Sequence, residues 1–309
     1  MKDKRGGYPK RYRISWKYSR YVRITLLMAL ALLLSCKPLE IDAAKNGVSW
    51  TVTQYGKKDS TRQSMFYSIK GSDGRVIIID GGWKEDECHV RKAISRLGSQ
   101  VDLWIITHPH PDHVGAFNAI METGDLKIKE IWAPKIKVPI YKKYQKPWDE
   151  YPIYQGFRRL MSKRSTMTWI KAGQEIPFYG LDFEFFNSYS YSIPKQTEDI
   201  CNGSSLVFKV SGKEDSMLFT GDMDPKVGKA LVKKYGERLQ ADYLQMPHHG
   251  NNRGRYPFFH VVDAKKVFVD APSFLLGYPM VKANLSYFKK KDIKIFTYRS
   301  SGYNKVGIQ

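Results

Sequence analysis

The sequence is poor in cysteine, histidine and acidic residues. Its 309 residues include three cysteines and seven histidines, and 30 Asp and Glu stand against 51 Lys and Arg. Three cysteines cannot build a disulfide framework, and the longest apolar run, residues 24–35, is too short to cross a bilayer comfortably. Neither a glycine-rich phosphate-binding loop nor a nucleophile elbow occurs. The composition therefore excludes a disulfide scaffold and a multi-span channel, and no motif indicates a serine hydrolase or a P-loop enzyme.

Basic residues remain in excess when the N-terminus is set aside. The formal net charge is +21, and residues 1–23 hold nine Lys or Arg and one acid, Asp3, which leaves +13 on residues 24–309. Such an excess favours an anionic partner, such as nucleic acid, a phosphorylated glycan or an anionic membrane. A soluble protein of high pI is the plain alternative. With 42% apolar and 14% aromatic residues, one globular domain is the simplest prediction.

The first 46 residues are typical of an exported bacterial protein. A basic lead ends at Arg23, an apolar stretch of signal-peptide length follows, and Leu-Leu-Ser-Cys at residues 33–36 resembles a lipoprotein box in which Cys36 would carry the lipid. An uncleaved membrane anchor is the alternative. We expect residues 1–35 to direct export, residues 36–46 to form a tether and residues 47–309 to form the domain. The domain would be held at the cell envelope, facing the periplasm or the exterior.

Ligand-type side chains are concentrated at residues 101–117. The apolar run at residues 103–106 predicts a buried strand. Pro109 and Pro111 disfavour the α region for the residues before them, so we expect an irregular loop over residues 108–112 and a helix over residues 114–122. Imidazoles and a carboxylate, which bind divalent transition metals, are crowded into this stretch as His108, His110, Asp112 and His113.

Two later segments also consist of an apolar strand that ends in ligand-type residues. Residues 216–223 contain Asp222, and residues 244–251 contain His248 and His249. His-x-His-x-Asp-His followed by these two segments resembles the metallo-β-lactamase superfamily, and within it the hydrolase domain of the DNA-uptake protein ComEC, which is similar in its Ser-Leu-Val, Thr-Gly-Asp and Pro-His-His-Gly. The resemblance covers residues 48–300 and implies a four-layer α/β fold, the αββα sandwich of two mixed β-sheets with outer helices.

The resemblance also implies two divalent metal ions, zinc or manganese. The ligands that it implies are His108 and His110 for the first ion, Asp112, His113 and one histidine of Pro-His-His-Gly for the second, and Asp222 as the bridge. We expect His248 to be that histidine, because it directly follows the strand, and His249 to lie nearby as a supporting or substrate-contacting residue. A similar Asp-Gly lies beside the metal loop in the family, so Asp80 is expected to orient a ligand histidine.

The chain departs from the family pattern in two places. Many members supply a third histidine to the first metal, but no histidine lies between His113 and His248, and Asn202 occupies the comparable place, as in the ComEC-like group. A neutral amide oxygen is a weak zinc ligand, which favours manganese or a loosely held zinc, unless the adjacent Cys201 points inward. Where ComEC-like domains often have His-Pro, this chain has Tyr278 before a proline, so a phenol replaces a substrate-contacting histidine.

A basic, aromatic segment is inserted at residues 126–171. From residue 127 onwards it has twelve Lys or Arg against three acids, interleaved with eight aromatic residues. Basic side chains neutralise phosphates and exposed aromatics stack on bases, so the segment suits a groove for single-stranded nucleic acid. The alternative is that the aromatics belong to the core and the lysines to a solvated face. The candidate substrate-binding residues are Lys142, Lys143, Trp148 and Tyr278.

The ligand set, the basic insertion and the ComEC-like motifs together predict an exported, metal-dependent phosphodiesterase or nuclease, with single-stranded DNA as the candidate substrate. A metal-bound hydroxide would be the nucleophile, and Asp112, which would accept a proton, and the bridging Asp222 would be the catalytic residues. Two other classes stay open: a hydrolase of amides, esters or lactones, and a non-catalytic binding protein of the envelope.

Overall fold

The computed structural model describes residues 47–190, 192–197, 199–251, 256–298 and 303–309. The expected export segment, Cys36 and the tether lie outside these residues. In the described part of the chain, no helix combines the length and the apolar character that a membrane span requires.

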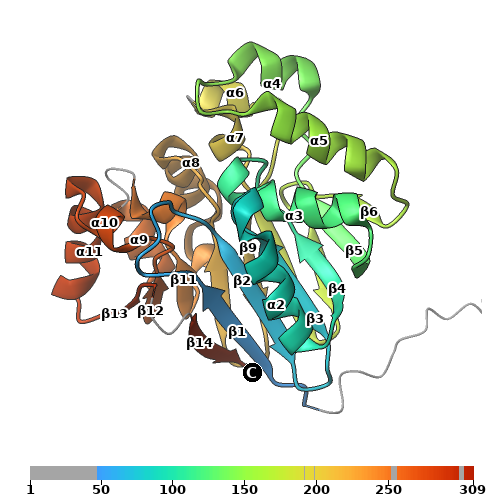
Figure 1. The fold of residues 1–309 in the computed structure, drawn as a ribbon. Helices are drawn as coiled ribbons and strands as arrows, with labels where there is room; N and C mark the ends of the chain where they lie inside the picture. The colour runs from blue at the N-terminus through green and yellow to red at the C-terminus, as the bar shows by residue number, and fades with distance from the viewer. Residues whose placement is uncertain (1–46, 191, 198, 252–255, 299–302) are drawn as a thin grey trace, which may run out of the picture. The chain divides into compact units, whose positions relative to one another are not determined.

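The domain is built on two seven-stranded mixed β-sheets (Figure 1). In order across the first sheet, the strands are β14 (Tyr303–Ile308), β1 (Trp50–Tyr55), β2 (Phe66–Gly71), β3 (Val76–Asp80), β4 (Gln100–Ile105), β5 (Lys127–Ala133) and β6 (Met167–Trp169). Across the second sheet they are β13 (Lys294–Phe296), β12 (Lys266–Phe268), β11 (Tyr243–Gln245), β10 (Ser216–Phe219), β9 (Val207–Ser211), β8 (Leu181–Asn187) and β7 (Glu175–Phe178).

Helices cover the outer face of each sheet. The helices against the first sheet are α2 (Glu87–Leu97), α3 (Pro111–Thr123) and α5 (Tyr151–Ser162), and those against the second are α8 (Pro225–Tyr235), α9 (Tyr256–Val262) and α11 (Pro279–Lys290). In β3, Ile77 and Ile79 enter the core between the sheets, whereas Val76 and Ile78 enter the core beneath the helices. A strand that is buried on both faces needs such an unbroken apolar run. The predicted αββα sandwich is confirmed by these layers.

Only the middle of the segment expected as an insertion folds into helices over the edge of the first sheet, because its two ends form β5 and β6 of that sheet. α5 packs on α3, and α4 (Val138–Tyr144) packs against the short helix α7 (Ile200–Gly203), as Figure 1 shows at the top of the view. Four of the eight aromatic residues are fully buried here: Trp132, Tyr141, Tyr154 and Phe157. The interpretation that the aromatics belong to the core therefore holds for half of the eight. Of these eight residues, Tyr144 and Trp148 are the two with exposed side chains.

The first and last strands lie side by side at one edge of the first sheet. Trp50 pairs with Ile308 of β14 on one side and with Gly71 of β2 on the other. Because Phe66, at the opposite end of β2, pairs with Asp80, β1 begins and β14 ends at the end of the sheet away from Asp80.

The parallel strands bring their carboxyl ends to one place between the two sheets. β3 and β4 run parallel in the first sheet, and β10, β11 and β12 run parallel in the second. Ligands of α/β sheets bind at such carboxyl ends. The residues at these carboxyl ends or just beyond them are Asp80, the stretch from His108 to His113, Asp222, the pair His248 and His249, and Asp270.

Candidate metal centre

The metal-loop residues are divided between a loop and the first turn of α3. His108 and His110 precede the helix, and Asp112 and His113 are already part of it. The expected loop over residues 108–112 is therefore wrong for its last two positions. The physical reason is Pro111, which occupies the first helical turn, where its fixed φ is suited to a helix and its missing N–H needs no partner.

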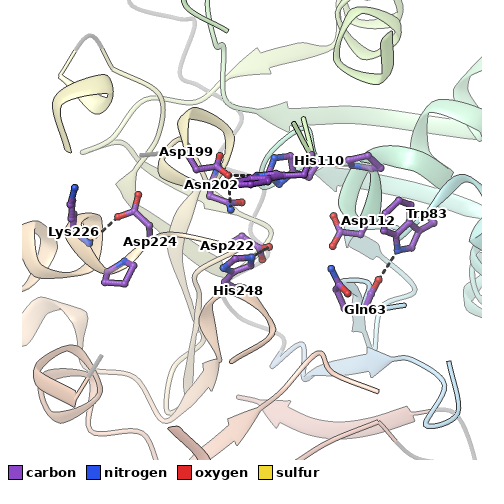
Figure 2. Close-up of a pocket in the computed structure, with 13 residues that line it drawn as sticks. Gln63, Trp83, His110, Asp112, Asp199, Asn202, Asp222, Asp224, Lys226 and His248 are labelled. Carbon is purple, nitrogen blue, oxygen red and sulfur yellow. Dashed lines mark hydrogen bonds and ion pairs between the residues drawn. The ribbon is translucent and has the colours of Figure 1, made fainter. Parts of the chain in front are cut away.

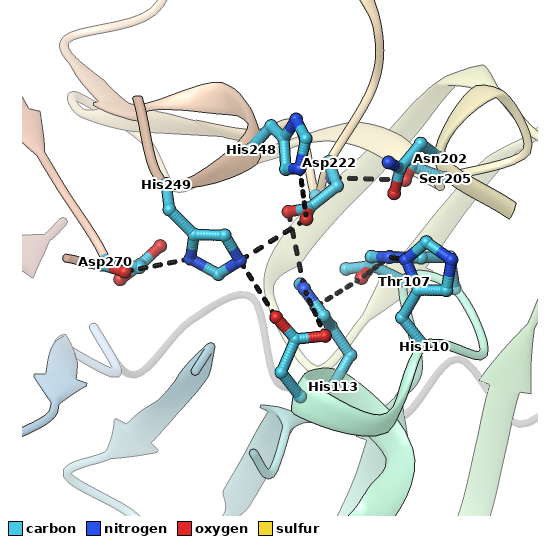
Figure 3. A network of polar contacts seen from close by, with 12 residues as sticks. Thr107, His110, His113, Asn202, Ser205, Asp222, His248, His249 and Asp270 are labelled. Atoms are coloured by element: carbon cyan, nitrogen blue, oxygen red, sulfur yellow. Dashed lines mark hydrogen bonds and ion pairs between the residues drawn. The ribbon is translucent and has the colours of Figure 1, made fainter. Parts of the chain in front are cut away.

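Four buried side chains converge on one point: Asp112, His113, Asp222 and His249. His249 Nε2 lies 3.3 Å from Asp112 Oδ2 and 3.3 Å from Asp222 Oδ2. On the other side, His113 Nε2 lies 3.3 Å from Asp222 Oδ1 (Figure 3). The two carboxylates and two imidazoles come from α3 and from the loops after β10 and β11, so they meet only in the folded chain.

The atoms that face this point have unfilled hydrogen-bonding capacity. Within the described residues, His113 Nε2, His249 Nε2 and Asp222 Oδ1 are buried and have no hydrogen-bond partner. A buried polar atom without a partner costs about 1–3 kcal/mol. A divalent cation would satisfy all three atoms at once, since neutral imidazole and carboxylate are its usual ligands. The four residues thus fit a metal ion.

His108 and His110 form a second pair of inward-facing nitrogens. His108 Nε2 and His110 Nδ1 lie 3.1 Å apart. The hydroxyl of Thr107 donates to Asp80, so it accepts from His108 Nδ1, and His110 Nε2 lies against Asp149. Both inner nitrogens then present lone pairs to each other, which is stable only with a proton or a cation between them. Two nitrogens that share one cation at ~2.0–2.1 Å are separated by about this distance.

His113 and His249 are also oriented by acceptors at their outward-facing nitrogens. Asp80, expected to support a ligand histidine, lies 2.7 Å from His113 Nδ1, and the carbonyl oxygen of Asp270 lies 2.8 Å from His249 Nδ1. A metal-binding imidazole usually gives its second nitrogen to such an acceptor, which fixes the ring and its tautomer. Every inward-facing histidine of the centre has this arrangement.

The local electrostatics favour positive charge at the centre. Burial disfavours a charged imidazole, but Asp222 and Asp112 outweigh it and raise the pKa of His249 to about 10. Burial likewise opposes charge on Asp222, and His249 and His113 hold the pKa of this carboxyl well below its usual range. A cavity that stabilises protons on its histidines is also one that stabilises a divalent cation.

Residues 60–256 match the family model of the metallo-beta-lactamase superfamily, and this range includes all of the ligand-type residues described above except Asp270. The chain belongs to the metallo-β-lactamase superfamily.

Two curated relatives support the ComEC-like relation within this superfamily. The chain is 29% identical to "Competence protein ComA" of Neisseria gonorrhoeae over 153 residues, which is 50% of this chain and 17% of that protein. It is 26% identical to "ComE operon protein 3" of Bacillus subtilis (strain 168) over 204 residues, which is 61% of this chain and 24% of that protein. The chain thus spans no more than about a quarter of these relatives.

Solved structures of low identity share the fold. The metallo-beta-lactamase fold protein YhfI of Bacillus subtilis has a TM-score of 0.50 at 11% identity, covering 84% of this chain and 100% of its own. CmlA, a diiron beta-hydroxylase from Streptomyces venezuelae, has a TM-score of 0.53 at 11% identity, covering 84% of this chain and 54% of its own. At 11% identity these likenesses show the fold alone and carry no statement about the reaction of this chain.

We expected His248 to be the ligand of the Pro-His-His-Gly segment, but the neighbouring histidine faces the centre instead. His249, rather than His248, points into the group with Asp112 and Asp222, while His248 lies on the pocket wall with its Nε2 3.7 Å from Asp222 Oδ2. Both residues have a left-handed backbone, with φ of 51° and 52°. Two successive residues of this kind turn the chain sharply after β11 and rotate the second ring, not the first, toward the centre.

Asn202 and Cys201, the candidate substitutes for the missing histidine, point to different places. Asn202 lines the pocket, and its buried Oδ1 has no hydrogen-bond partner in the described part of the chain. Cys201 is buried beside Tyr141 and Asp149, and burial together with the nearby carboxylates raises its thiol pKa well above the usual value. Asn202 therefore presents a free acceptor toward the pocket, whereas Cys201 holds a protonated thiol behind it.

A pocket of about 540 Å³ opens over the centre (Figure 2). Trp148 is part of its lining and is 60% exposed, whereas Lys142, Lys143 and Tyr278 are not part of it. Lys142 instead lies over the ring of Tyr151, and Lys143 lies over Tyr144. Of the four candidate substrate-binding residues, the structure brings only Trp148 to this pocket.

Sequence reasoning missed several residues of the site. Trp83 and Gln63 line the pocket on the side of Asp112, and Asp224 and Lys226 on the side of Asp222 (Figure 2). Asp149 and Asp199 lie behind His110; they were only two acids in a basic or polar stretch. The only signal that the sequence offered for Asp149 was an acid in a lysine-rich segment.

Proposed function

We propose that the chain is an exported, metal-dependent phosphodiesterase that cleaves single-stranded nucleic acid. The observation that carries the proposal is the pair of inward-facing groups, one at His108 and His110 and the other at Asp112, His113, Asp222 and His249. Two adjacent cation sites that open onto one pocket suit the displacement of an oxygen at a phosphodiester.

The side chains around the centre have separable roles in this proposal. Divalent ions held there would acidify a bound water and offset the negative charge of the phosphodiester oxygens. Asp222 would hold the ion of its own group, because its Oδ1 lies 3.3 Å from His113 Nε2 and its Oδ2 lies 3.3 Å from His249 Nε2, and the resemblance to the superfamily implies that it would also contact the other ion. Asp112, whose Oδ2 lies 3.3 Å from His249 Nε2, would take the proton of the attacking water. His248, on the pocket wall, would contact the phosphate or protonate the leaving oxygen.

The pocket supports a nucleic-acid substrate in two ways. Trp148 offers an exposed indole next to the centre, and stacking of a base on an aromatic ring contributes about 1–3 kcal/mol. Lys226 also lines the pocket and would neutralise a phosphate. The relation to the competence proteins and the +13 charge of residues 24–309 favour the same substrate class.

Cleavage of labelled single-stranded DNA by the purified full chain tests the proposal. We expect cleavage with Mn²⁺ or Zn²⁺, its loss with EDTA, and a loss of at least 100-fold in His110→Ala, since each cation ligand is needed for the displacement. His260→Ala is the matched control, because His260 is exposed on α9. Hydrolysis of a chromogenic β-lactam without DNA cleavage would replace the proposal with amide hydrolysis. A folded chain that retains no divalent ion would replace it with a binding protein.

A further inference from the structure

A second buried group of ligand-type side chains lies behind His110. Its members are His110, Asp149, Asp199 and Cys201, and they come from the metal loop, the turn between α4 and α5, and the segment that begins α7. His110 Nε2 lies 2.5 Å from Asp149 Oδ1, and the Asp149 side chain is fully buried. Apart from His110, the members of this group lie outside the metal-ligand motifs of the sequence.

The carboxylates of this second group are already satisfied by protein donors. Asp149 accepts from His110 at one oxygen and from the backbone N–H of Lys146 at the other. Asp199 accepts from the backbone N–H of Asn202 at Oδ1 and from Trp148 Nε1 at Oδ2. The group at Asp222 has unpartnered atoms instead. This contrast indicates that the second group supports a ligand and does not itself hold an ion.

We propose that Asp149 is a positioning residue for the first metal ion, acting through His110. By accepting the proton of His110 Nε2, the carboxylate fixes the tautomer in which Nδ1 presents its lone pair to His108 Nε2, 3.1 Å away. A carboxylate in this position also makes the imidazole a stronger ligand. Asp149 thereby strengthens the site that lacks a third histidine. The inference rests on the metal dependence in the proposed function but not on the substrate.

The inserted segment is thus part of the centre as well as of the pocket wall. Trp148 and Asp149 are consecutive, and the first lines the pocket while the second lies against His110. Pro147 and the Asp149 to Lys146 contact hold this turn in a fixed shape.

The role of Asp149 can be tested by measuring Zn²⁺ affinity, which requires no substrate. The full chain would be titrated with Zn²⁺ against a chromophoric chelator, and we expect two ions in the wild type. In Asp149→Ala the affinity for one ion should fall about 10- to 100-fold, and the other ion, held by Asp112, His113, Asp222 and His249, should be unaffected. Asp149→Asn keeps an acceptor for His110 Nε2 and should lose less. Glu150→Gln, at the exposed neighbour, is the matched control and should match the wild type.

A double-mutant cycle separates positioning from a purely structural role. If Asp149 acts through His110, then Asp149→Ala should have no further effect on Zn²⁺ affinity in a chain that already carries His110→Ala. Additive losses, wild-type affinity in Asp149→Ala, or a single ion bound by the wild type would each overturn the inference. If Asp149→Ala fails to fold, Asp149→Asn carries the same comparison. Failure of DNA cleavage with an intact cycle would reject the substrate but not this role of Asp149.

Discussion

Replacing Gly115 by alanine tests how tightly α3 is fitted against the loop that leads to the centre. A Cβ at Gly115 would lie 2.4 Å from the backbone nitrogen of Lys84 and 2.8 Å from the carbonyl carbon of Trp83. The two segments are also joined by the hydrogen bond from Ala116 N to Gly82 O, 3.1 Å long. Because all of these atoms are backbone, no side chain can turn away to make room.

The cost follows from the overlap. Non-bonded carbon contacts are favourable at about 3.5–4.0 Å, so one backbone segment must move by about 1 Å. Overpacking costs about 1–3 kcal/mol, and a 2.4 Å contact with backbone atoms lies in the upper part of this range, at about 2–3 kcal/mol. The better helix propensity of alanine offsets about 1 kcal/mol. We expect a net loss of about 1–2 kcal/mol, which lowers Tm by roughly 2–8 °C in a domain of this size.

Thermal unfolding with and without Zn²⁺ is the assay for Gly115→Ala. Since α3 carries Asp112 and His113, a displaced helix should also reduce the stabilisation that Zn²⁺ gives. Gly156→Ala in α5 is the control, because its nearest atom beyond the helix is Asn118 Nδ2 at 3.9 Å. This change should leave Tm equal or slightly raised. A Tm for Gly115→Ala equal to that of the wild type would refute the close fit of α3.

Three further substitutions test the pocket, the proposed lipid attachment at Cys36 and the stability of the domain in acid. Trp148→Ala should weaken single-stranded DNA binding about 5- to 150-fold by removing a stacking surface, whereas Tyr278→Ala, which is not part of the pocket lining, should not, as measured by fluorescence anisotropy. Cys36→Ser should abolish incorporation of a labelled fatty acid during expression in a bacterial host; continued labelling would exclude a lipid on this residue. Burial opposes ionisation of Asp102, but Lys129 and the backbone of Val76 lower its pKa overall, so its stabilisation is present above the ordinary pKa of an aspartate and is lost as pH falls through the lowered value. In unfolding scans the Tm gap between wild type and Asp102→Asn should therefore close in acid, and a gap that widens would contradict this assignment.

The metal loop and the fold class were predictable because their signals are local. An apolar run that ends in His-x-His-x-Asp-His specifies both a buried strand and the residues that follow it. Which of His248 and His249 faces the metal centre could not be predicted from the local sequence. It depends on two left-handed residues after β11, and neighbouring histidines give no sign of which one turns inward.

The support for His110 was not predictable, because it depends on contacts between distant segments. Asp149 is 39 positions from His110, and its segment was interpreted from its charge. The apolar spacing of α5, with Tyr154, Phe157 and Met161 buried on one face, is a helical signal that the basic composition obscured.

The last strand shows the same limit. The alternation of buried Asn304, Val306 and Ile308 in β14 is visible in the sequence, but its partner β1 lies about 250 positions earlier, so the pairing could not be predicted from local sequence.

The position of β1 and β14 bears on how a long polymer would reach the pocket. Trp50 and Ile308 lie at the end of the first sheet away from Asp80, and the pocket lies beyond the carboxyl end of β3. A nucleic-acid strand that enters the pocket would therefore approach from the end of the first sheet opposite Trp50 and Ile308, and neither β1 nor β14 would stand in its way.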